Sequence, residues 1–167
     1  RVDALGKLGL GSYDHVVLEL PDNPLGLQRD DVIAEKSDSN QTGLLLANIG
    51  GSSLCSVDVA GSFGRDLARK GEAEMVAFAA EWLTKLYGSD IKGAIKRSTV
   101  TRWNESPFVM GAVSAAAPGA QGSRRVLAEP LGSLFFAGEA THETGWGTVG
   151  GAWESGERAA EAALRRI

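Results

Sequence analysis

The C-terminal third of the chain contains the pattern that most restricts how it can fold. Residues 134–141 read Leu-Phe-Phe-Ala-Gly-Glu-Ala-Thr, an apolar run that stops at a Gly-Glu pair, and residues 145–153 form a Gly-rich segment after a short loop. The apolar run predicts a buried strand over residues 134–137. The Gly-rich segment predicts the start of a helix over residues 148–166, where bare backbone can approach a polar ligand.

Length and composition limit the class of protein. The 167 residues, 43% of them hydrophobic, are enough for a globular domain with a core, and the net charge of -4 with dispersed basic residues argues against nucleic acid as a partner. No apolar run approaches the roughly 20 residues that span a bilayer, and the first residues lack the apolar core of a signal peptide. We therefore expect a soluble, cytoplasmic protein with no membrane partner.

The first two thirds of the chain predict several strands and one long helix. Four short runs in succession suggest an antiparallel meander over residues 15–20, 31–36, 44–49 and 54–59. Apolar residues then recur at helical spacing up to Gly88, which predicts a helix over residues 72–87. Strand character returns over residues 94–102, whereas the Ala-, Pro- and Gly-rich residues 114–122 predict a loop or irregular extended segment.

Gly145, Gly147 and Gly150 match the spacing of a dinucleotide-binding fingerprint. That fingerprint requires a second strand after the helix, with an acidic residue about 20 positions on to hold the ribose, and the sequence contains no such unit. The pattern instead favours a closing strand and helix of a nucleotide fold whose fingerprint lies elsewhere. The N–H groups of Thr148 and Val149 carry partial positive charge and could face an electron-rich oxygen of a ring or phosphate.

Three segments carry a resemblance to a known family: Leu134–Thr141 with Gly147-Thr-Val-x-Gly-Ala152 and Ser155-Gly156, Thr101-Arg-Trp103 with Pro107-Phe108 and Gly111, and Leu8–Gly11 leading to Val16-Val-Leu18. In this order and spacing the chain resembles the C-terminal part of the flavin-containing amine oxidases. That family includes polyamine oxidases, monoamine oxidases and lysine-specific histone demethylases. The first segment resembles the family's C-terminal FAD-binding signature.

The resemblance implies an α+β fragment of a two-domain, FAD-dependent amine oxidase. Residues 1–115 would belong mostly to an antiparallel, β-rich substrate domain, and residues 116–167 would supply the last strand and helix of a Rossmann-like FAD domain. Members of the family begin with a Rossmann unit that this sequence lacks, and the first residue is not Met. We therefore expect a missing N-terminal FAD-domain segment as the partner of this chain.

The resemblance also implies which residues bind FAD. Gly138 and Glu139 match the Gly-Glu pair beside the ribityl and pyrophosphate groups, and Gly147, Thr148 and Val149 match the helix start that meets the isoalloxazine. Trp103 matches a tryptophan near the flavin. Other roles remain open: Glu139 as an exposed carboxylate, Thr148 as an ordinary helix cap and Trp103 as a core residue. Cys55 does not match the cysteine that attaches flavin in some members, so we expect non-covalent FAD.

The substrate cavity is expected near Val113, His142, Trp146 and Thr148. Val113 and Thr148 match places where many members carry the aromatic walls of a cage around the amine, so Trp146 and Trp153 are candidates to compensate. Arg1 matches, by spacing, the active-site lysine of the family, although the register there is open by one residue. Two histidines and one cysteine far apart in sequence offer no metal site.

The implied reaction is oxidation of a small-molecule amine to an imine, with the electrons passing to oxygen, and no side chain of the chain is assigned as a general base. One alternative is an amino-acid oxidase, for which Arg102 would be the candidate carboxylate clamp, or a desaturase-like flavoenzyme. The other is an isolated, inactive fragment that folds without binding flavin.

Overall fold

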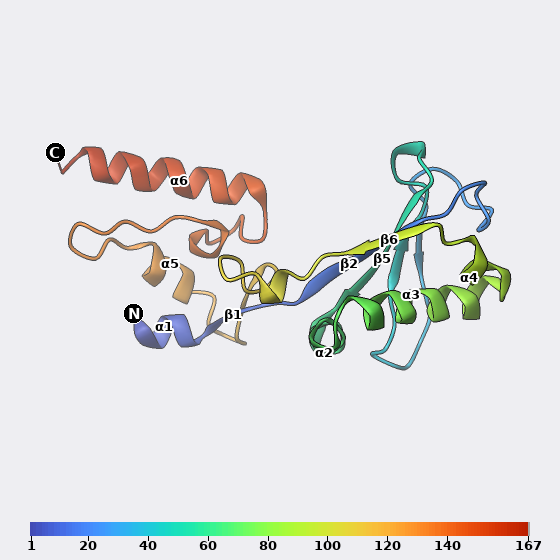
Figure 1. Cartoon of the computed structure of the whole chain (residues 1–167). Helices are drawn as coiled ribbons and strands as arrows, with labels where there is room; N and C mark the ends of the chain where they lie inside the picture. The colour runs from blue at the N-terminus through green and yellow to red at the C-terminus, as the bar shows by residue number, and fades with distance from the viewer. Residues whose placement is uncertain (167) are drawn as a thin grey trace. The chain divides into compact units, whose positions relative to one another are not determined.

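Five antiparallel strands form the larger sheet of the computed structural model, which describes residues 1–166 (Figure 1). The strand order is β3-β4-β5-β2-β6, and the strands are β2 (Tyr13–Glu19), β3 (Val32–Ala34), β4 (Leu44–Leu46), β5 (Leu54–Ala60) and β6 (Arg97–Val100). The predicted meander is formed by β3, β4 and β5. The first run of the predicted meander, β2, does not pair with β3. It lies between β5 and β6, with His15 opposite Asp58 and Val16 opposite Val100.

Helices α2 (Gly61–Lys70) and α3 (Glu72–Tyr87) contact the sheet, and α4 (Asp90–Ala94) packs on α3. Figure 1 shows both long helices on one face of the sheet. The alternating residues of β2 that face them are fully buried, and they share a core with Val57, Met75 and Leu83. The predicted helix over residues 72–87 is confirmed with these bounds.

Helix α2 was not predicted because its sequence offers few apolar residues and contains Gly64. That glycine is required by packing, since a Cβ atom there would lie 2.8 Å from the carbonyl carbon of Val59. Two short 3-10 helices complete this part of the chain, η1 (Ile49–Gly51) and η2 (Trp103–Glu105). By its contacts, the chain divides into one unit of residues 12–112 and a second unit that joins residues 1–11 to the segment from Val113 onward.

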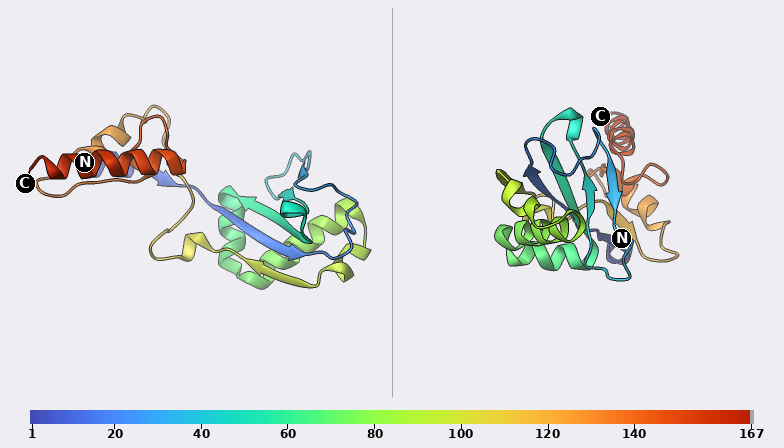
Figure 2. Two further views of the ribbon diagram at one scale, coloured as in Figure 1. Left: turned by 90° about the horizontal axis from the view of Figure 1, so that it is seen from above. Right: turned by 90° about the vertical axis from the view of Figure 1, so that its right-hand side faces the viewer.

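The second unit contains α1 (Val2–Gly6), β1 (Leu8–Leu10), β7 (Ser114–Ala116), α5 (Ser123–Ala128), η3 (Glu139–Thr141) and α6 (Val149–Leu164). β1 and β7 pair antiparallel, so the first residues of the segment expected to be irregular form a strand. The helix expected over residues 148–166 is shorter at both ends, and Figure 2 shows it as one continuous helix.

The strand predicted over residues 134–137 is wrong for this structure. Leu134 forms an isolated bridge with Leu131, and residues 135–137 have no strand partner among the described residues. An extended segment becomes a strand only when a neighbour satisfies its backbone groups. Leu134 is 60% exposed, so the predicted burial of this apolar run is not observed either.

The unit that contains α6 has a polar interior. Its buried side chains include Ser114, Ser123, Arg124, Thr141 and Ser155, whereas its apolar side chains Val149, Trp153 and Leu164 are each at least 70% exposed. Helices of the described residues are too short or too polar to cross a membrane. The boundary expected between residues 115 and 116 and the roles expected for the two parts stay predictions.

Candidate functional site

The carboxylate of Glu139 joins two segments of the α6-containing unit. Oε1 accepts a hydrogen bond from the backbone N–H of Ser114 at 2.9 Å, and Oε2 accepts from the Ser114 hydroxyl and from the backbone N–H of Gly147, both at 2.8 Å. Burial alone would raise the pKa of Glu139, but these bonds and the charge of Arg124 together lower the pKa below its usual value. Glu139 is therefore a half-buried anchor rather than the exposed carboxylate of the alternative interpretation.

Arg124 is fully buried beneath this anchor, and sequence reasoning did not identify it. Its guanidinium donates to the Ser114 hydroxyl at 2.5 Å, to the Ser114 carbonyl at 3.1 Å and to the Ala140 carbonyl at 3.2 Å. It also lies 4.8 Å from the centre of the Trp146 ring. Adjacent Arg125 is exposed, and no feature of the sequence distinguishes the two arginines.

The start of α6 has a threonine cap and backbone N–H groups without a partner. Thr148 is the N-cap residue: its hydroxyl accepts from the Gly151 N–H at 2.9 Å and donates to the Gly145 carbonyl at 2.7 Å. Gly147 has a φ of +74°, which favours glycine. Within the described residues, the N–H groups of Thr148, Val149 and Gly150 have no hydrogen-bond partner, so three donors remain free at the positive end of the helix.

Two close approaches fix this helix start. A Cβ atom on Gly151 would lie 2.0 Å from the carbonyl oxygen of Gly145, so only glycine fits there. The hydroxyl of Ser155 accepts from the Gly138 N–H at 2.8 Å, which ties the residue before Glu139 to the second turn of α6. Gly138, Glu139, Gly147, Thr148 and Val149 thus lie close together around the start of α6. Their binding of FAD remains a prediction.

His142 is used to hold the loop before α6. Its Nδ1 accepts from the Gly145 N–H at 2.7 Å, so the proton is on Nε2, which donates to Glu154 at 2.8 Å. Val113 lies beside Gly147, because a Cβ atom on that glycine would be 3.8 Å from the Val113 side chain. Trp146 is 42% exposed and Val113 49%, so both can contact a ligand.

Trp103 belongs to the other unit, in η2. It is 44% exposed and therefore not a core residue. Its backbone N–H donates to the fully buried carboxylate of Asp14 at 2.9 Å, and Asp14 also accepts from Thr101 and Asn104. Asp14 is a second buried anchor that sequence reasoning missed. The strand pattern does not indicate that an aspartate at this position is buried and accepts hydrogen bonds from several groups.

Two arginines considered from the sequence are occupied by nearby groups. Arg1 donates to the carbonyls of Glu129 and Pro130 and lies 5.0 Å from the centre of the Phe136 ring. Arg102 forms an ion pair with Glu105. Arg102 is therefore already paired, and no observation favours it as a carboxylate clamp.

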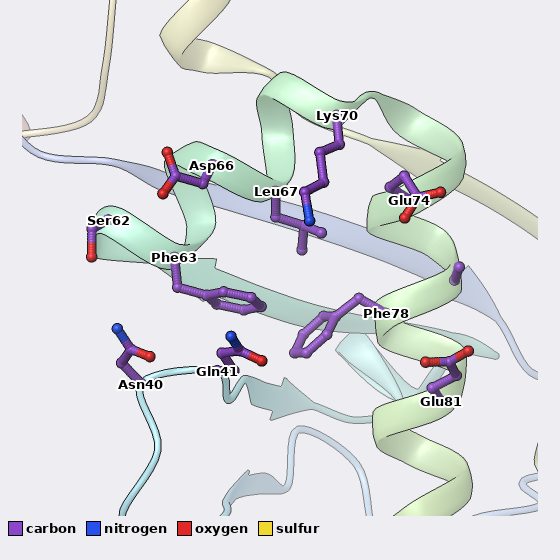
Figure 3. A pocket seen from close by; sticks show the side chains of 11 residues that line it. Asn40, Gln41, Ser62, Phe63, Asp66, Leu67, Lys70, Glu74, Phe78 and Glu81 are labelled. Carbon is purple, nitrogen blue, oxygen red and sulfur yellow. The ribbon is translucent and has the colours of Figure 1, made fainter.

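A cavity of about 520 Å³ lies elsewhere, between α2, α3 and the loop at Asn40 and Gln41. Phe63 and Phe78 are among the residues that line it, and Figure 3 shows their side chains pointing toward each other, with ring centres 4.9 Å apart. None of the residues predicted to bind cofactor or substrate lines it. Across the residues that the structure covers, no group of three or more His, Cys, Asp and Glu side chains is arranged to hold a metal ion.

The sequence matches oxidoreductases that act with a flavin. Over residues 1–164 it matches the family described as flavin containing amine oxidoreductases. It is 34% identical over 168 residues to lysine-specific histone demethylase 1 homolog 3 of Arabidopsis thaliana, which covers 94% of this chain and 10% of that protein. It is 32% identical over 102 residues to peroxisomal N(1)-acetyl-spermine/spermidine oxidase of Homo sapiens, which covers 56% of this chain and 20% of that protein.

Solved amine oxidases share the fold. Cyclohexylamine oxidase from Brevibacterium oxydans IH-35A aligns with a TM-score of 0.73 at 20% identity, over 96% of this chain and 36% of that one. A variant of putrescine oxidase aligns with a TM-score of 0.74 at 16% identity, over 99% and 38%. These comparisons confirm the resemblance: the chain belongs to the flavin-containing amine oxidoreductase family. It spans only a small part of the relatives that it matches.

Proposed function

We propose that this chain forms part of an FAD-dependent enzyme that oxidises a small-molecule amine, with the start of α6 at the flavin. The observation that carries this proposal is the set of three unpartnered N–H groups at Thr148, Val149 and Gly150. They lie at the exposed start of a 16-residue helix, and Val149 is 88% exposed. Donors at the positive end of a helix suit the electron-rich carbonyl oxygens of a flavin ring.

The residues around this helix start fit such a group. Glu139 fixes Gly147 through a hydrogen bond, and Thr148 satisfies the N–H of Gly151, so the loop that presents the free donors is held from both sides. Gly147 and Gly150 carry no side chain that would block the approach of a planar ring. As the family resemblance implies, Gly138 and Glu139 would lie toward the ribityl and pyrophosphate groups of FAD. By the same resemblance, Trp103 would be a residue near the flavin.

When bound, FAD would supply the redox chemistry by accepting a hydride from the carbon that bears a neutral amine, which would leave a protonated imine (iminium). Water would hydrolyse this iminium, and dioxygen is the proposed acceptor of the two electrons of the hydride, which would leave with its proton and one further proton as hydrogen peroxide. The protein's own contribution is to bind and orient the amine and to exclude water from it. Val113, Thr148, His142 and Trp146 would line the substrate cavity, and FAD would be held without a covalent bond.

The domain roles are part of the same proposal. Residues 1–115 would supply most of the substrate domain, and residues 116–167 would close the FAD domain. The exposed Leu134 and Phe136 support this, because residues 134–137 would gain a strand partner and burial in a Rossmann-like sheet formed by chain outside these residues. The small share of the relatives' length that the chain covers also supports its being a fragment.

The visible absorption spectrum of the full-length gene product tests this proposal. We expect a yellow protein that releases peroxide with at least one member of a panel of amines. A separate panel of L- and D-amino acids serves as the comparison for the amino-acid oxidase alternative. A colourless protein would overturn the proposal, and a yellow protein that oxidises only amino acids would replace the substrate class.

The isolated residues 1–167 provide a second test. We expect no FAD to remain bound through gel filtration, because these residues would supply only one edge of the cofactor site. Stoichiometric retention of FAD by the isolated chain would show that the proposed FAD domain does not need further sequence.

A further inference from the structure

We propose that Arg124 is a positioning residue for the amine oxidase site. It holds the Trp146 side chain and the loop before α6 in the conformation that contacts the flavin and the substrate. This inference rests on the proposed function. Arg124 does not contact the free N–H groups directly. It also reaches the residues that the family resemblance assigns to FAD only through other residues.

The guanidinium of Arg124 is buried without an ion-pair partner. Its side chain is 0% exposed, and among the described residues no carboxylate lies within 4.0 Å of it. Its charge is compensated by hydroxyl and carbonyl dipoles, by the Trp146 ring and by the charge of Glu139 beyond Ser114. A buried charge is costly, and a well-packed apolar side chain often serves stability as well or better. Packing alone therefore does not explain an arginine here.

Two routes of contact lead from Arg124 to the same place in the chain. The first runs through the Ser114 hydroxyl to Glu139 and on to the N–H of Gly147. The second is direct contact with the ring of Trp146 at 4.8 Å. Trp146 and Gly147 are consecutive and lie immediately before the three free N–H groups. Arg124 thus sets both the backbone and the side chain at the entrance to the helix.

The contact with Trp146 also restricts which ligand the ring can accept. A cation prefers the face of an aromatic ring, and Arg124 occupies one face of Trp146. Trp146 is still 42% exposed, so it can offer the remaining surface as an apolar wall. It follows that Trp146 contacts an apolar substituent of the amine more readily than a second ammonium group.

Substitutions at adjacent arginines separate this role from general stability. We would compare R124M and R124K with R125M in the full-length, flavin-loaded protein, because Arg125 is exposed and has no hydrogen-bond or ion-pair partner among the described residues. The measurements are the flavin absorption spectrum, the separate kcat and KM values for an amine substrate, and fluorine NMR of fluorotryptophan-labelled protein. W146F identifies the Trp146 resonance.

We expect R124M to shift and broaden the Trp146 resonance, to change the flavin bands, and to lower kcat/KM by roughly tenfold to 100-fold, as a small displacement at a reacting centre does. R124K should be intermediate, because lysine keeps the charge but lacks the planar fork that reaches Ser114 and Trp146 together. R125M should match the wild-type protein in all three measurements.

A wild-type Trp146 resonance and flavin spectrum in R124M would overturn the inference. If R124M does not fold, R124K decides by the same two signals, and an unchanged R124K would overturn it equally. A colourless wild-type protein would instead refute the proposed function, while the Trp146 resonance would still report whether Arg124 holds that ring.

Discussion

Oε2 of Glu139 lies 2.8 Å from the backbone nitrogen of Gly147, so this carboxylate fixes the loop that leads into α6. We expect E139Q to destabilise the fold by about 1–3 kcal/mol, because both carboxylate oxygens of Glu139 accept hydrogen bonds whereas an amide has a single oxygen, and its NH2 group would face a donor. Urea denaturation measures the change. E157Q is the matched control, because Glu157 is an exposed α6 residue for which residues 1–166 offer no hydrogen-bond or ion-pair partner. Equal stability of the two variants would contradict the role of Glu139.

Glu139 also predicts a contribution to acid sensitivity. Its pKa in the folded protein lies below the usual value of 4.5, so its contribution to stability is present above pH 4.5 and is lost as the pH falls through the lowered pKa. Other carboxylates with lowered pKa values, such as Glu19 and Glu35, add to the total loss. The difference between the wild-type and E139Q unfolding free energies should therefore shrink on acidification. A difference that stays constant from neutral pH to well below pH 4.5 would contradict this.

Two glycines of α6 should respond in opposite directions to the same substitution. G151A places a methyl group where only 2.0 Å separates it from the Gly145 carbonyl, and we expect a loss of about 1–3 kcal/mol or more. The added methyl group of G156A would meet no described atom within 4 Å apart from the nearby backbone of its own helix, and G156A should gain about 0.5–1 kcal/mol because alanine favours the helix. Thermal denaturation of both variants checks the signs. Stabilisation by G151A would show that the loop and the helix are not in contact there.

Tyr13 should titrate late. Its pKa is raised to about 12 by burial first, then by the hydrogen bond to Asp58 and by the charge of that carboxylate. The difference between the tyrosinate absorbance of the wild-type protein and that of Y13F measures this pKa. D58N should lower the value only part of the way to 10.0, because burial remains.

The same shift gives a sign for stability at high pH. The folded state keeps the Tyr13 proton above pH 10.0, where an unfolded chain releases it, so the contribution of Tyr13 is complete below that pH and is lost between pH 10 and about 12. Y13F should remove this part of the alkaline loss. An unchanged alkaline profile in Y13F would show that Tyr13 ionises normally.

Local patterns of the sequence predicted much of the fold. The apolar stripe of α3, the runs of β4 and β5 and the capped start of α6 were readable because neighbouring residues decide these elements. The position of β2 between β5 and β6 was not, because pairing across long separations leaves no local signal. The prediction of a strand over residues 134–137 was wrong for a related reason. An apolar run predicts a strand, but a strand forms only when its backbone pairs with a neighbouring segment.

The candidate site was readable where the chain carries a motif. Glu139, Gly147 and Thr148 were singled out from the Gly-Glu pair and the Gly-rich helix start, and in the structure Glu139 bonds to Gly147 while Thr148 caps α6. Their binding of FAD remains a prediction. Arg124 and Ser114 were not found, because a buried arginine and a strand serine look like surface residues in a sequence. Their roles depend on contacts with residues 10 to 25 positions away.

The pairing of β1 with β7 has a consequence for the order of folding. The N–H of Gly11 donates to the carbonyl of Val113 at 2.9 Å, so residues 12–112 are inserted between two strands that pair with each other. During synthesis, β1 cannot pair with β7 until residues 12–112 have left the ribosome. The sheet of residues 12–112 can form in the meantime. Its closure would bring the ends of a very long loop together before β1 and β7 meet, and so remove most of the entropic cost of their pairing.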